Sequence, residues 1–575
     1  MEKQCRFCGR PVKHGDICDY CSELLCEICG ERLSRGYCSV CGRLVCDEDS
    51  RMVGFARICI DCINENPNLL SYDYLKRRYF DLSSLNVEPV EFRRVFAFGH
   101  RDVFCGDSIY VHIGLDDLDS PYGMCTTYAG AVLVSELSQF GVEFMDYPLL
   151  IRLNPNIPFK TRGNAAVAIR IRTSPEVYEK LKNVVFTALK DLAHIFFRKT
   201  QPGVVFYVSD EYKLDRLLNS IYVDALRGIV TIKGLKKQLN QIRVGYIEIY
   251  SISNDMGRGA IGAISAIGSA LDDYTFELLA YRRYGRLNEN RYIDVDSVVK
   301  MDKKLWPYVF DSLDGNRMLI APTGPDPVLF GIRGEYPEKL IEAFDMTRHE
   351  DISLWCIFRT NQATGSHIKP VSSLKDAYPY ETVMVRVIVD SVHRLNDKVV
   401  LNAIAENTPI VAYIYKIQRP LQSIAMKLKK GDKIIIVIAI TSKNNGVIEG
   451  NLEEFIPLEL SEEIVYRNPP CPVCCARLKK KGKNEMYCRK CHFRFKGIFK
   501  IAIKKHDRDI HTKRRYLPPP RAHRHLTLPN ERIYFRAKKI MEKEKPYLIN
   551  KFFGREKIPM ESIVATKRID EPRIT

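Results

Sequence analysis

The sequence predicts a multidomain α+β protein with N-terminal zinc knuckles, an α/β domain, a ferredoxin-like domain, an OB-fold barrel and a C-terminal zinc ribbon. Three observations support this organisation. Cysteine pairs cluster within the first 65 residues and again near residue 480, strand and helix patterns alternate between them, and a run of short alternating segments precedes the second cluster. The chain has 575 residues, 46% of them hydrophobic, which is ample for several cores.

The first 65 residues hold 11 of the 19 cysteines. Cysteine pairs of this spacing indicate zinc in an intracellular chain, because thiolates bind the ion tetrahedrally and the metal replaces a core that a short segment cannot build. The spacing leaves open whether the pairs combine sequentially or in a cross-braced order, and it leaves the partner of this region open. Taken sequentially, the ligand sets are Cys5, Cys8, Cys18 and Cys21; Cys26, Cys29, Cys38 and Cys41; and Cys46, Asp49, Cys59 and Cys62.

Composition favours a cytoplasmic protein with no membrane partner. No apolar run reaches the ~18 residues that a membrane-spanning helix needs, and the first residues do not form a signal peptide pattern. The oligomeric state is left open.

The α/β domain is expected at residues 106–248, because strand and helix patterns alternate there as in βαβ units. One helix begins with a serine N-cap and Pro175, and the glycine at 141 closes an earlier helix. The expected strands are 109–113, 165–171 and 204–208, and the expected helices are 129–137 and 175–198.

Three carboxylates, Asp116, Asp117 and Asp119, end the first strand of this domain. A tight turn follows, and Thr126 and Thr127 open the next helix. Helix N-termini hold phosphate because their first N–H groups are unpaired, and Mg²⁺ takes carboxylate and phosphate oxygens. The sequence therefore favours a metal–nucleotide site over a solvated acidic turn with a threonine cap.

A second loop carries Lys160 and Arg162 ahead of a strand. Its two prolines and two cations are compatible with a loop that contacts an anion, and equally with a rigid connector.

The ferredoxin-like domain is expected at residues 249–372, where several strands and two helices follow in a suitable order. Asp255 precedes a glycine-rich helix, and Asp326 lies at a strand edge. The expected strands are 246–252, 275–281, 318–321 and 328–332. The glycine-rich helix is expected to end at about residue 271, and a second helix is expected at 337–344. Residues 355–367 are expected to form a polar loop.

About five short β segments at residues 378–460 predict a small OB-like barrel, a frequent platform for single-stranded nucleic acid, with a plain β spacer as the alternative. A zinc ribbon is expected at 465–500, followed by a basic tail at 501–575. Residues 66–105 are expected as a connector with a short helix at about 72–79. The ribbon ligands are Cys471, Cys474, Cys488 and Cys491.

The net charge of +18 is concentrated near this ribbon. Residues 477–524 hold 18 lysines and arginines against 3 acidic residues, which gives 18 − 3 = +15. Basic residues interleaved with aromatic ones favour nucleic acid over a solvated tail. The expected RNA contacts are Lys479, Lys480, Lys481, Lys513, Arg514 and Arg515.

These motifs together resemble the archaeal agmatinylcytidine synthetases that act on isoleucine tRNA, the TiaS family. The resemblance covers about residues 106–530. Its motifs are Gly-Leu-Asp-Asp-Leu-Asp-Ser at 114–120, Gly-Met-Cys-Thr-Thr-Tyr at 123–128, Arg-Leu-Asn-Pro at 152–155, Lys-Thr-Arg-Gly-Asn at 160–164, Gly-Arg-Gly at 257–259, the run at 324–334, Arg-Thr-Asn-Gln at 359–362 with His367, and the motifs at 516–518 and 524–526.

The resemblance implies a kinase-like ATP-binding catalytic domain, a ferredoxin-like domain, an OB fold and a zinc ribbon. It implies that ATP activates the wobble cytidine of the CAU anticodon and that the agmatine amine displaces the activated oxygen at C2. ATP ends as AMP and two phosphates, and the modified tRNA decodes AUA as isoleucine. The implied cofactors are ATP, Mg²⁺ and Zn²⁺, and the implied partners are that tRNA and agmatine.

By position, the three aspartates correspond to the carboxylates that hold Mg²⁺–ATP, and Thr126 corresponds to the threonine that the family autophosphorylates. Agmatine is a dication, so its site should be acidic. Asp255 and Asp326 are the candidates for it. The implied nucleotide-binding residues are Gly123, Met124, Cys125, Thr127, Lys160 and Arg162.

Two features depart from the family pattern. Leu118 stands where the family usually has threonine, so a role of that hydroxyl would be lost here. The 105-residue N-terminal extension is outside the usual family layout. Two alternatives therefore stay open, a catalytically silent protein that binds tRNA or the ribosome, and a related ATP-dependent modifier that uses another amine.

Overall fold

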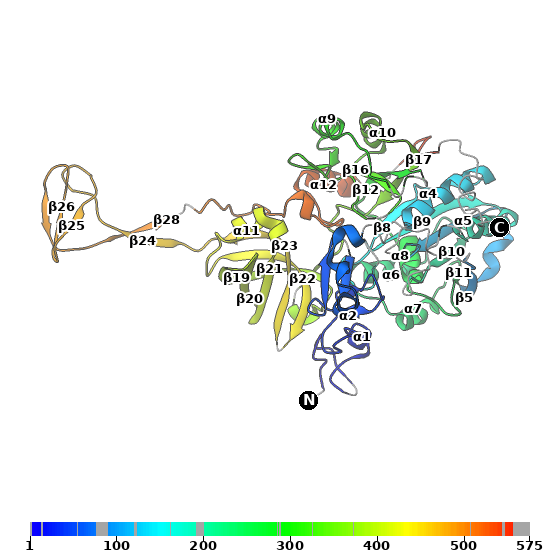
Figure 1. The fold of residues 1–575 in the computed structure, drawn as a ribbon, viewed down its shortest axis with the longest axis horizontal. Coiled ribbons are helices and arrows are strands. Elements are labelled where there is room, and N and C mark those ends of the chain that lie inside the picture. Colours follow the sequence, from blue (N-terminus) through cyan, green and yellow to red (C-terminus); the bar gives the residue numbers. More distant parts are fainter. Residues whose placement is uncertain are drawn as a thin grey trace, which may run out of the picture.

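The computed structural model describes residues 3–12, 15–54, 56–75, 90–119, 124–160, 163–190, 192, 200–283, 286, 289–324, 326–371, 373–444, 446–505, 508–542 and 547–555. A large body built on one sheet carries a β-barrel at its side, and a slender extension projects from the barrel (Figure 1). The N-terminal cysteine-rich region lies between the barrel and the body (Figure 1).

The body is organised around one twelve-stranded mixed sheet. Ten strands form a continuous path, while β7 (Glu143–Phe144) pairs with β9 and β29 (Phe553–Arg555) pairs with β17. In spatial order the path is β13 (Val309–Phe310), β16 (Val328–Gly334), β12 (Thr275–Arg282), β17 (Ile352–Thr360), β8 (Leu149–Arg152), β9 (Ala165–Thr173), β6 (Ile109–Asp116), β10 (Gly203–Ser209), β11 (Tyr246–Ser251) and β5 (Arg93–Gly99).

Helices cover both faces of this sheet, and two large apolar cores fill the space between. On one face lie α4 (Thr126–Leu137), α5 (Pro175–Lys190), α9 (Val295–Leu305) and α10 (Pro337–Met346). On the other lie α6 (Arg216–Arg227), α7 (Ile232–Leu239) and α8 (Gly259–Gly268).

The βαβ alternation that predicted a simple α/β domain corresponds to a split βαβ unit. Helix α5 joins β9 to β10, but β6 lies between these strands and is antiparallel to both. Helix α10 joins β16 to β17 in the same way around β12. A parallel contact between β17 and β8 fuses the two units into one sheet, so the expected boundary near residue 248 does not interrupt it.

Several expected elements differ in the structure. Residues 355–360 were expected in a polar loop but belong to buried strand β17, because their side chains alternate across a sheet that is covered on both faces. The expected strand at 318–321 reduces to β15 (Arg317–Met318), which pairs with β14 (Leu313–Asp314). The connector at 66–105 contributes the edge strand β5. Part of the helix expected at 72–79 and part of the C-terminal end of the helix expected at 175–198 lie outside the described residues.

The barrel is closed by five strands, because β19 pairs with both β20 and β22, and β21 and β23 complete the ring. Its interior is a separate apolar core. The strands are β19 (Thr382–Leu395), β20 (Lys398–Ala405), β21 (Thr408–Ile414), β22 (Lys433–Asn444) and β23 (Val447–Glu459), with β18 (Ile368–Pro370) alongside β19 and helix α11 (Arg419–Ala425) packed on the outside.

Two cysteine-rich regions flank this assembly. The N-terminal one contains α1 (Asp19–Ser22), β1 (Gly36–Tyr37), β2 (Leu44–Val45), β3 (Ser50–Val53), β4 (Ala56–Cys59) and α2 (Ile60–Glu65). The other is carried on the paired strands β24 (Glu463–Arg467) and β28 (Ile501–Lys505) and contains β25 (Lys479–Lys481), β26 (Glu485–Tyr487) and β27 (Arg494–Lys496). Helix α12 (Ile533–Glu542) returns to the body. Among the described residues, no helix has the length and apolar character that crossing a membrane requires.

Candidate functional site

The three aspartates predicted from the sequence come together at the end of β6. Asp116 is the last residue of the strand, and Asp117 adopts a φ of 58°, which turns the chain towards Asp119. The backbone N–H of Gln201 donates to Asp117 Oδ2 at 2.6 Å and fixes that carboxylate. All three carboxylates line a single pocket, which we call the first pocket.

Helix α8 approaches this site closely because Gly259 and Gly262 in its first turn have no side chains. A Cβ built on Gly262 would lie 1.9 Å from Asp116 Oδ2, and one on Gly259 would lie 3.0 Å from the Asp116 carbonyl oxygen. The glycine-rich helix start therefore makes room for the carboxylate of Asp116.

The carboxylates are arranged to attract a cation. Burial raises the pKa of Asp116 well above its usual value, and the neighbouring charges of Asp117 and Asp119 raise it further. A divalent ion bound here would offset that cost, and an all-oxygen carboxylate set matches the preference of Mg²⁺. The residues present fit a magnesium ion.

Leu118 does not take part in this pocket. Its side chain is 0% exposed and packs in the core on the α4 face, while its backbone N–H donates to Thr126 Oγ1 at 3.3 Å. A hydrophobic residue is suited to that environment, and the backbone contact is independent of the side chain. The departure at this position therefore alters the core rather than the carboxylate cluster.

Lys160 lines the first pocket with the aspartates, Phe159 and Arg258. Its Nζ donates to the Pro155 carbonyl. Burial lowers the pKa of Lys160 to about 7, with Arg524 and Arg57 adding to the effect. Two residues expected to contact nucleotide, Gly123 and Arg162, lie outside the described residues.

A second pocket of about 520 Å³ adjoins the first and shares Asp119, Gly163 and Ala165 with it. The start of α4 contributes Cys125, Thr126 and Thr127 to its lining.

Thr126 Oγ1 donates to Asp119 Oδ1 at 3.5 Å, so its hydroxyl lies at the junction of the pockets. Met124, also expected near nucleotide, is buried with a φ of 60° and lines neither pocket.

The second pocket also contains residues that were not predicted as site residues. Arg333 Nε donates to Glu277 Oε1 at 3.1 Å, and its terminal nitrogen lies 2.8 Å from His525 Nδ1. Burial, followed by the charges of Arg152 and Arg333, lowers the pKa of His525 well below its usual value. The sequence signal for Glu277 was a lone carboxylate inside the apolar run of β12.

The two acidic candidates for the amine lie in different surroundings. Asp326 lines the second pocket. Asp255 is 66% exposed, forms an ion pair with Lys236 at 2.7 Å and lines neither of these two pockets. Of the two, Asp326 is the one that shares a pocket with the threonines of α4.

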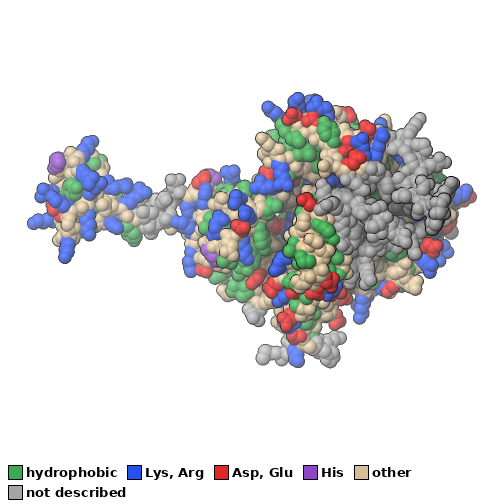
Figure 2. All heavy atoms as spheres, viewed as in Figure 1, with side chains coloured by type: hydrophobic (Ala, Val, Ile, Leu, Met, Phe, Trp, Pro, Cys, Tyr) green, Lys and Arg blue, Asp and Glu red, His purple; other side chains and the backbone are tan. Residues whose placement is uncertain are grey.

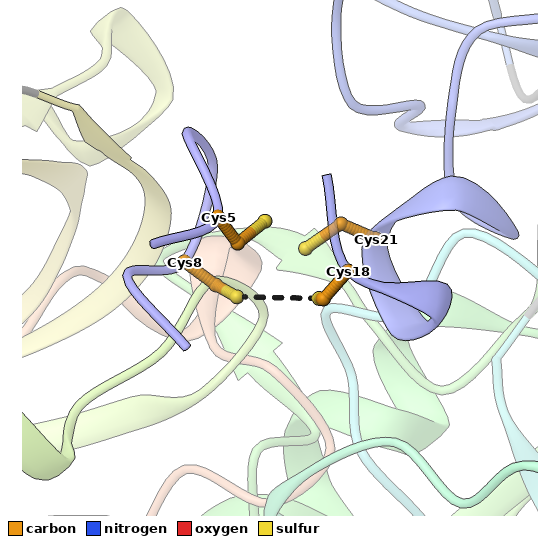
Figure 3. A group of neighbouring side chains, drawn as sticks. All are labelled: Cys5, Cys8, Cys18 and Cys21. Carbon is orange, nitrogen blue, oxygen red and sulfur yellow. Dashed lines mark hydrogen bonds between the residues drawn. The ribbon is translucent and has the colours of Figure 1, made fainter. Parts of the chain in front are cut away.

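Four groups of side chains among the described residues have the geometry of a metal site. In the first, Cys5 and Cys8 extend from a loop and Cys18 and Cys21 from the start of α1, and Cys8 Sγ lies 3.6 Å from Cys18 Sγ (Figure 3). Zn–S bonds of about 2.3 Å put tetrahedral sulfurs roughly 3.8 Å apart, so these residues fit zinc. The groups are Cys5, Cys8, Cys18 and Cys21; Cys26, Cys29, Cys46 and Asp49; Cys38, Cys41, Cys59 and Cys62; and Cys471, Cys474, Cys488 and Cys491.

Of the two pairing orders that the spacing left open, the structure has the cross-braced one for the second and third N-terminal sets. Strands β1 and β2 form a hairpin whose tip carries Cys38 and Cys41 away from Cys26. The returning strand brings Cys46 beside Cys26 instead, as the bond from Glu27 N–H to the Leu44 carbonyl at 2.8 Å requires.

The basic residues predicted to contact RNA divide into two groups. Lys479, Lys480 and Lys481 form β25 and are exposed on the projecting ribbon, where Figure 2 shows lysines and arginines gathered. Arg515 has another function in the fold, because its guanidinium pairs with Glu454 and donates to the Leu528 carbonyl at 2.6 Å. The guanidinium of Arg514 lies over the Tyr516 ring at 5.5 Å, and the Lys513 N–H donates to the Pro457 carbonyl of the barrel at 2.7 Å.

Together, the sheet-edge carboxylates, joined pockets, closed barrel and cysteine clusters define a multidomain α/β enzyme with metal-binding modules. Family models described as the TiaS TCKD domain and the TiaS FLD domain match residues 112–251 and 257–367. The chain belongs to the TiaS family.

Named relatives support this assignment. The isoleucine-tRNA 2-agmatinylcytidine synthetase TiaS of Pyrococcus horikoshii is 37% identical over 425 residues, which are 73% of this chain and 96% of that protein. The enzyme of the same name from Methanosarcina mazei is 35% identical over 434 residues, 72% and 96% of the two chains.

Solved structures agree with the sequence relatives. A crystal structure of TiaS in complex with its isoleucine tRNA and ATP matches with a TM-score of 0.62 at 30% identity, covering 74% of this chain and 98% of that one. A complex of TiaS with the same tRNA, AMPCPP and agmatine matches with a TM-score of 0.62 at 28% identity and the same coverage. Both family models begin after residue 111, so the N-terminal cysteine-rich region lies outside them.

Proposed function

We propose that this protein is an ATP-dependent ligase that joins agmatine to C2 of the wobble cytidine in isoleucine tRNA with a CAU anticodon. The relatives that match nearly their whole length carry the name of this activity, and solved relatives hold isoleucine tRNA, ATP and agmatine. The observation that carries the proposal in this chain is the pair of pockets that meet at Asp119, beside Thr126.

The first pocket is the proposed nucleotide site. Asp116, Asp117 and Asp119 would hold Mg²⁺, and Lys160 lines the same pocket with a charge suited to phosphate. Mg²⁺ at these residues would supply positive charge that offsets the charge of the phosphates. The N–H groups at the start of α4 offer donors for the phosphate from the second pocket.

The second pocket is the proposed site of the cytidine and the amine. A cytosine carbonyl oxygen leaves poorly, and a phosphoryl group from ATP converts it into a leaving group. The amine nitrogen of agmatine then bonds to C2, and phosphate departs with that oxygen. Thr126 lies between the pockets and is the proposed acceptor of the second phosphoryl group of ATP, because its hydroxyl touches Asp119 and its side chain lines the second pocket. Water then releases that group from Thr126, so ATP ends as AMP and two phosphates.

Agmatine needs anionic partners in that pocket. Glu277 and Asp326 are the carboxylates there apart from Asp119 and Asp311. Asp326 was predicted from the sequence as an agmatine contact and is kept in the proposed site. Asp255 is left out of it because its side chain is exposed.

The remaining regions are proposed to hold RNA. The closed five-stranded barrel is proposed as an OB fold, and the projecting cysteine ribbon as the element that holds the anticodon. The fused sheet, which carries the two pockets, is proposed to contain the kinase-like and ferredoxin-like domains. Wobble cytidine must leave the anticodon stack to reach the pocket, and contacts on its neighbours stabilise the exposed base.

The direct test combines purified protein, ATP, Mg²⁺, labelled agmatine and unmodified tRNA. We expect label in RNA and stoichiometric AMP, with neither product when the wobble cytidine is replaced by uridine. Label in RNA from a different amine but not from agmatine would reassign the substrate, and absence of both label and AMP would refute the ligase activity.

A further inference from the structure

The N-terminal module, residues 3–75, packs against the wall of the first pocket. The Tyr37 and Phe159 ring centroids are 6.3 Å apart, and the Arg258 guanidinium lies over the same Phe159 ring, 3.6 Å from its centroid. Phe159 and Ile229 also join the apolar cluster formed by the first cysteine site of the module. In Figure 1 this dark blue module lies between the barrel and the body.

The same residues form part of the surface of the pocket. Phe159, Ile229 and Arg258 all line it, together with the aspartates. The loop that carries Phe159 has no regular secondary structure, so its position depends on packing. Burial lowers the pKa of Arg258, and the carboxylates of Glu23 in the module and Asp117 in the pocket partly oppose this effect.

The module is also held on the barrel side. Tyr380 Oη donates to the Ser34 carbonyl at 2.7 Å, and the Arg10 guanidinium lies 4.3 Å from the centre of the Tyr378 ring. Contacts on two domains at once fix the module in one place, so it is part of the pocket wall rather than a tethered appendage.

The charge of the module argues against an RNA-binding role. Residues 3–75 contain 9 lysines and arginines and 11 acidic residues, which gives 9 − 11 = −2 before metal thiolates are counted. Phosphate binding needs the opposite sign. The module instead makes apolar and aromatic contacts with the wall of the first pocket.

Metal binding couples to the contact with Phe159 through the chain itself. Tyr37 is in β1, directly before Cys38, and its hairpin separates the cross-braced pair of metal sites. Zinc at these sites would set the hairpin and hence the position of the Tyr37 ring.

We propose that the N-terminal module is a zinc-ordered outer wall of the nucleotide pocket, and that Tyr37 is a positioning residue that holds Phe159 and Arg258 in place for Mg·ATP. This inference rests on the proposed ATP site. It gives the extension a function within the reaction, namely to raise affinity for nucleotide without touching RNA.

The test measures Mg·ATP binding to the full-length protein without tRNA, and KM and kcat with tRNA. Tyr37→Ala is expected to weaken ATP binding and raise the KM for ATP roughly three- to tenfold, the range for losing an aromatic contact. Zinc content, kcat and tRNA affinity stay at wild-type values. Tyr37→Phe retains the ring and restores the affinity. Met52→Ala is the matched control, because that side chain is in the same module but 56% exposed.

Cys38→Ser provides a second route that does not alter the ring. We expect it to lose zinc and to weaken ATP binding at least as much as Tyr37→Ala. If wild-type protein binds no Mg·ATP, the proposed ATP site is wrong. If wild-type protein binds Mg·ATP and both variants bind it with the same affinity, the proposed ATP site stands. That result would refute the proposal that the N-terminal module forms a wall of the site.

Discussion

The two cysteine-rich regions carry the same kind of cysteine cluster but lie in opposite surroundings. The N-terminal module is packed between barrel and body and carries a net charge of −2 over residues 3–75. The C-terminal ribbon projects on two strands, and residues 465–500 hold 11 basic residues and 1 acidic residue, which gives 11 − 1 = +10. A zinc site fixes a local fold, but the charge and placement of the surface around it determine what that fold contacts.

This contrast predicts that neither region supplies the reacting groups, so the largest effect should come from the aspartate site. Gly262→Ala puts a methyl group where the Asp116 carboxylate lies, at 1.9 Å. We expect kcat to fall by at least about 100-fold, with a loss of roughly 1–3 kcal/mol in unfolding free energy from overpacking. The control is Ala263→Gly, one residue along α8. If the kcat of Gly262→Ala stays within twofold of the wild-type value, α8 does not confine Asp116.

The ribbon should govern tRNA affinity. The triple change Lys479→Gln, Lys480→Gln and Lys481→Gln removes three exposed charges and is expected to weaken tRNA binding by roughly 10- to 100-fold at physiological salt, with a reduction of up to about 3 in the salt slope. Affinity for Mg·ATP should not change. Filter binding across a salt series measures both quantities, with Lys303→Gln on α9 as the control. An unchanged salt slope would remove the ribbon from the RNA interface.

Removing the N-terminal module should affect nucleotide and not RNA. A chain that begins at residue 90 keeps edge strand β5 and loses the outer wall. We expect the KM for ATP to rise roughly tenfold, equivalent to ~1.4 kcal/mol of binding free energy, and tRNA affinity to stay constant. A folded truncation that has lost tRNA binding would contradict the division between the two regions.

The smallest expected effect concerns pH and connects the module to the pocket. The pKa of Lys160 is lowered to about 7, first by burial and then by Arg524 and Arg57. Phosphate raises this pKa on binding, so ATP affinity is greatest below pH 7 and falls as the pH rises above it, by at most tenfold per pH unit.

Calorimetry in buffers of different ionisation enthalpy should detect proton uptake above pH 7, and Lys160→Met should abolish it. Arg57→Ala, in the module, should move the onset to higher pH, since a like charge is removed. Proton uptake that persists in Lys160→Met would assign it to another group.

Local signals predicted much of the site, and contacts distant in sequence account for the rest. The run at 114–120 identified the aspartates, because a strand followed by carboxylates and a helix start is encoded in consecutive residues. The cross-braced pairing could not be read from spacing, since Cys46 meets Cys26 only through the β1–β2 hairpin. Split βαβ units and simple ones share the same element order, so the insertion of β6 between β9 and β10 was also hidden.

Side-chain direction was the other quantity that sequence did not provide. Leu118 lies within the acidic run, yet it points into the core, because the turn at Asp117 reverses the alternation. Arg515 belongs to the basic stretch, yet it pairs internally with Glu454. In both cases the direction of one side chain differs from what the composition of its segment suggests.

In the proposed mechanism, the carboxylates at the end of β6 serve the ATP-dependent step while the ribbon and barrel hold the RNA. The most direct measurement compares wild type with Asp117→Asn for labelled agmatine incorporation and tRNA affinity on the same samples. We predict incorporation in the wild type, a loss of at least about 1,000-fold in the variant, and tRNA dissociation constants within about twofold of each other. Equal incorporation by both proteins, or a parallel loss of tRNA binding in the variant, would contradict this division of roles.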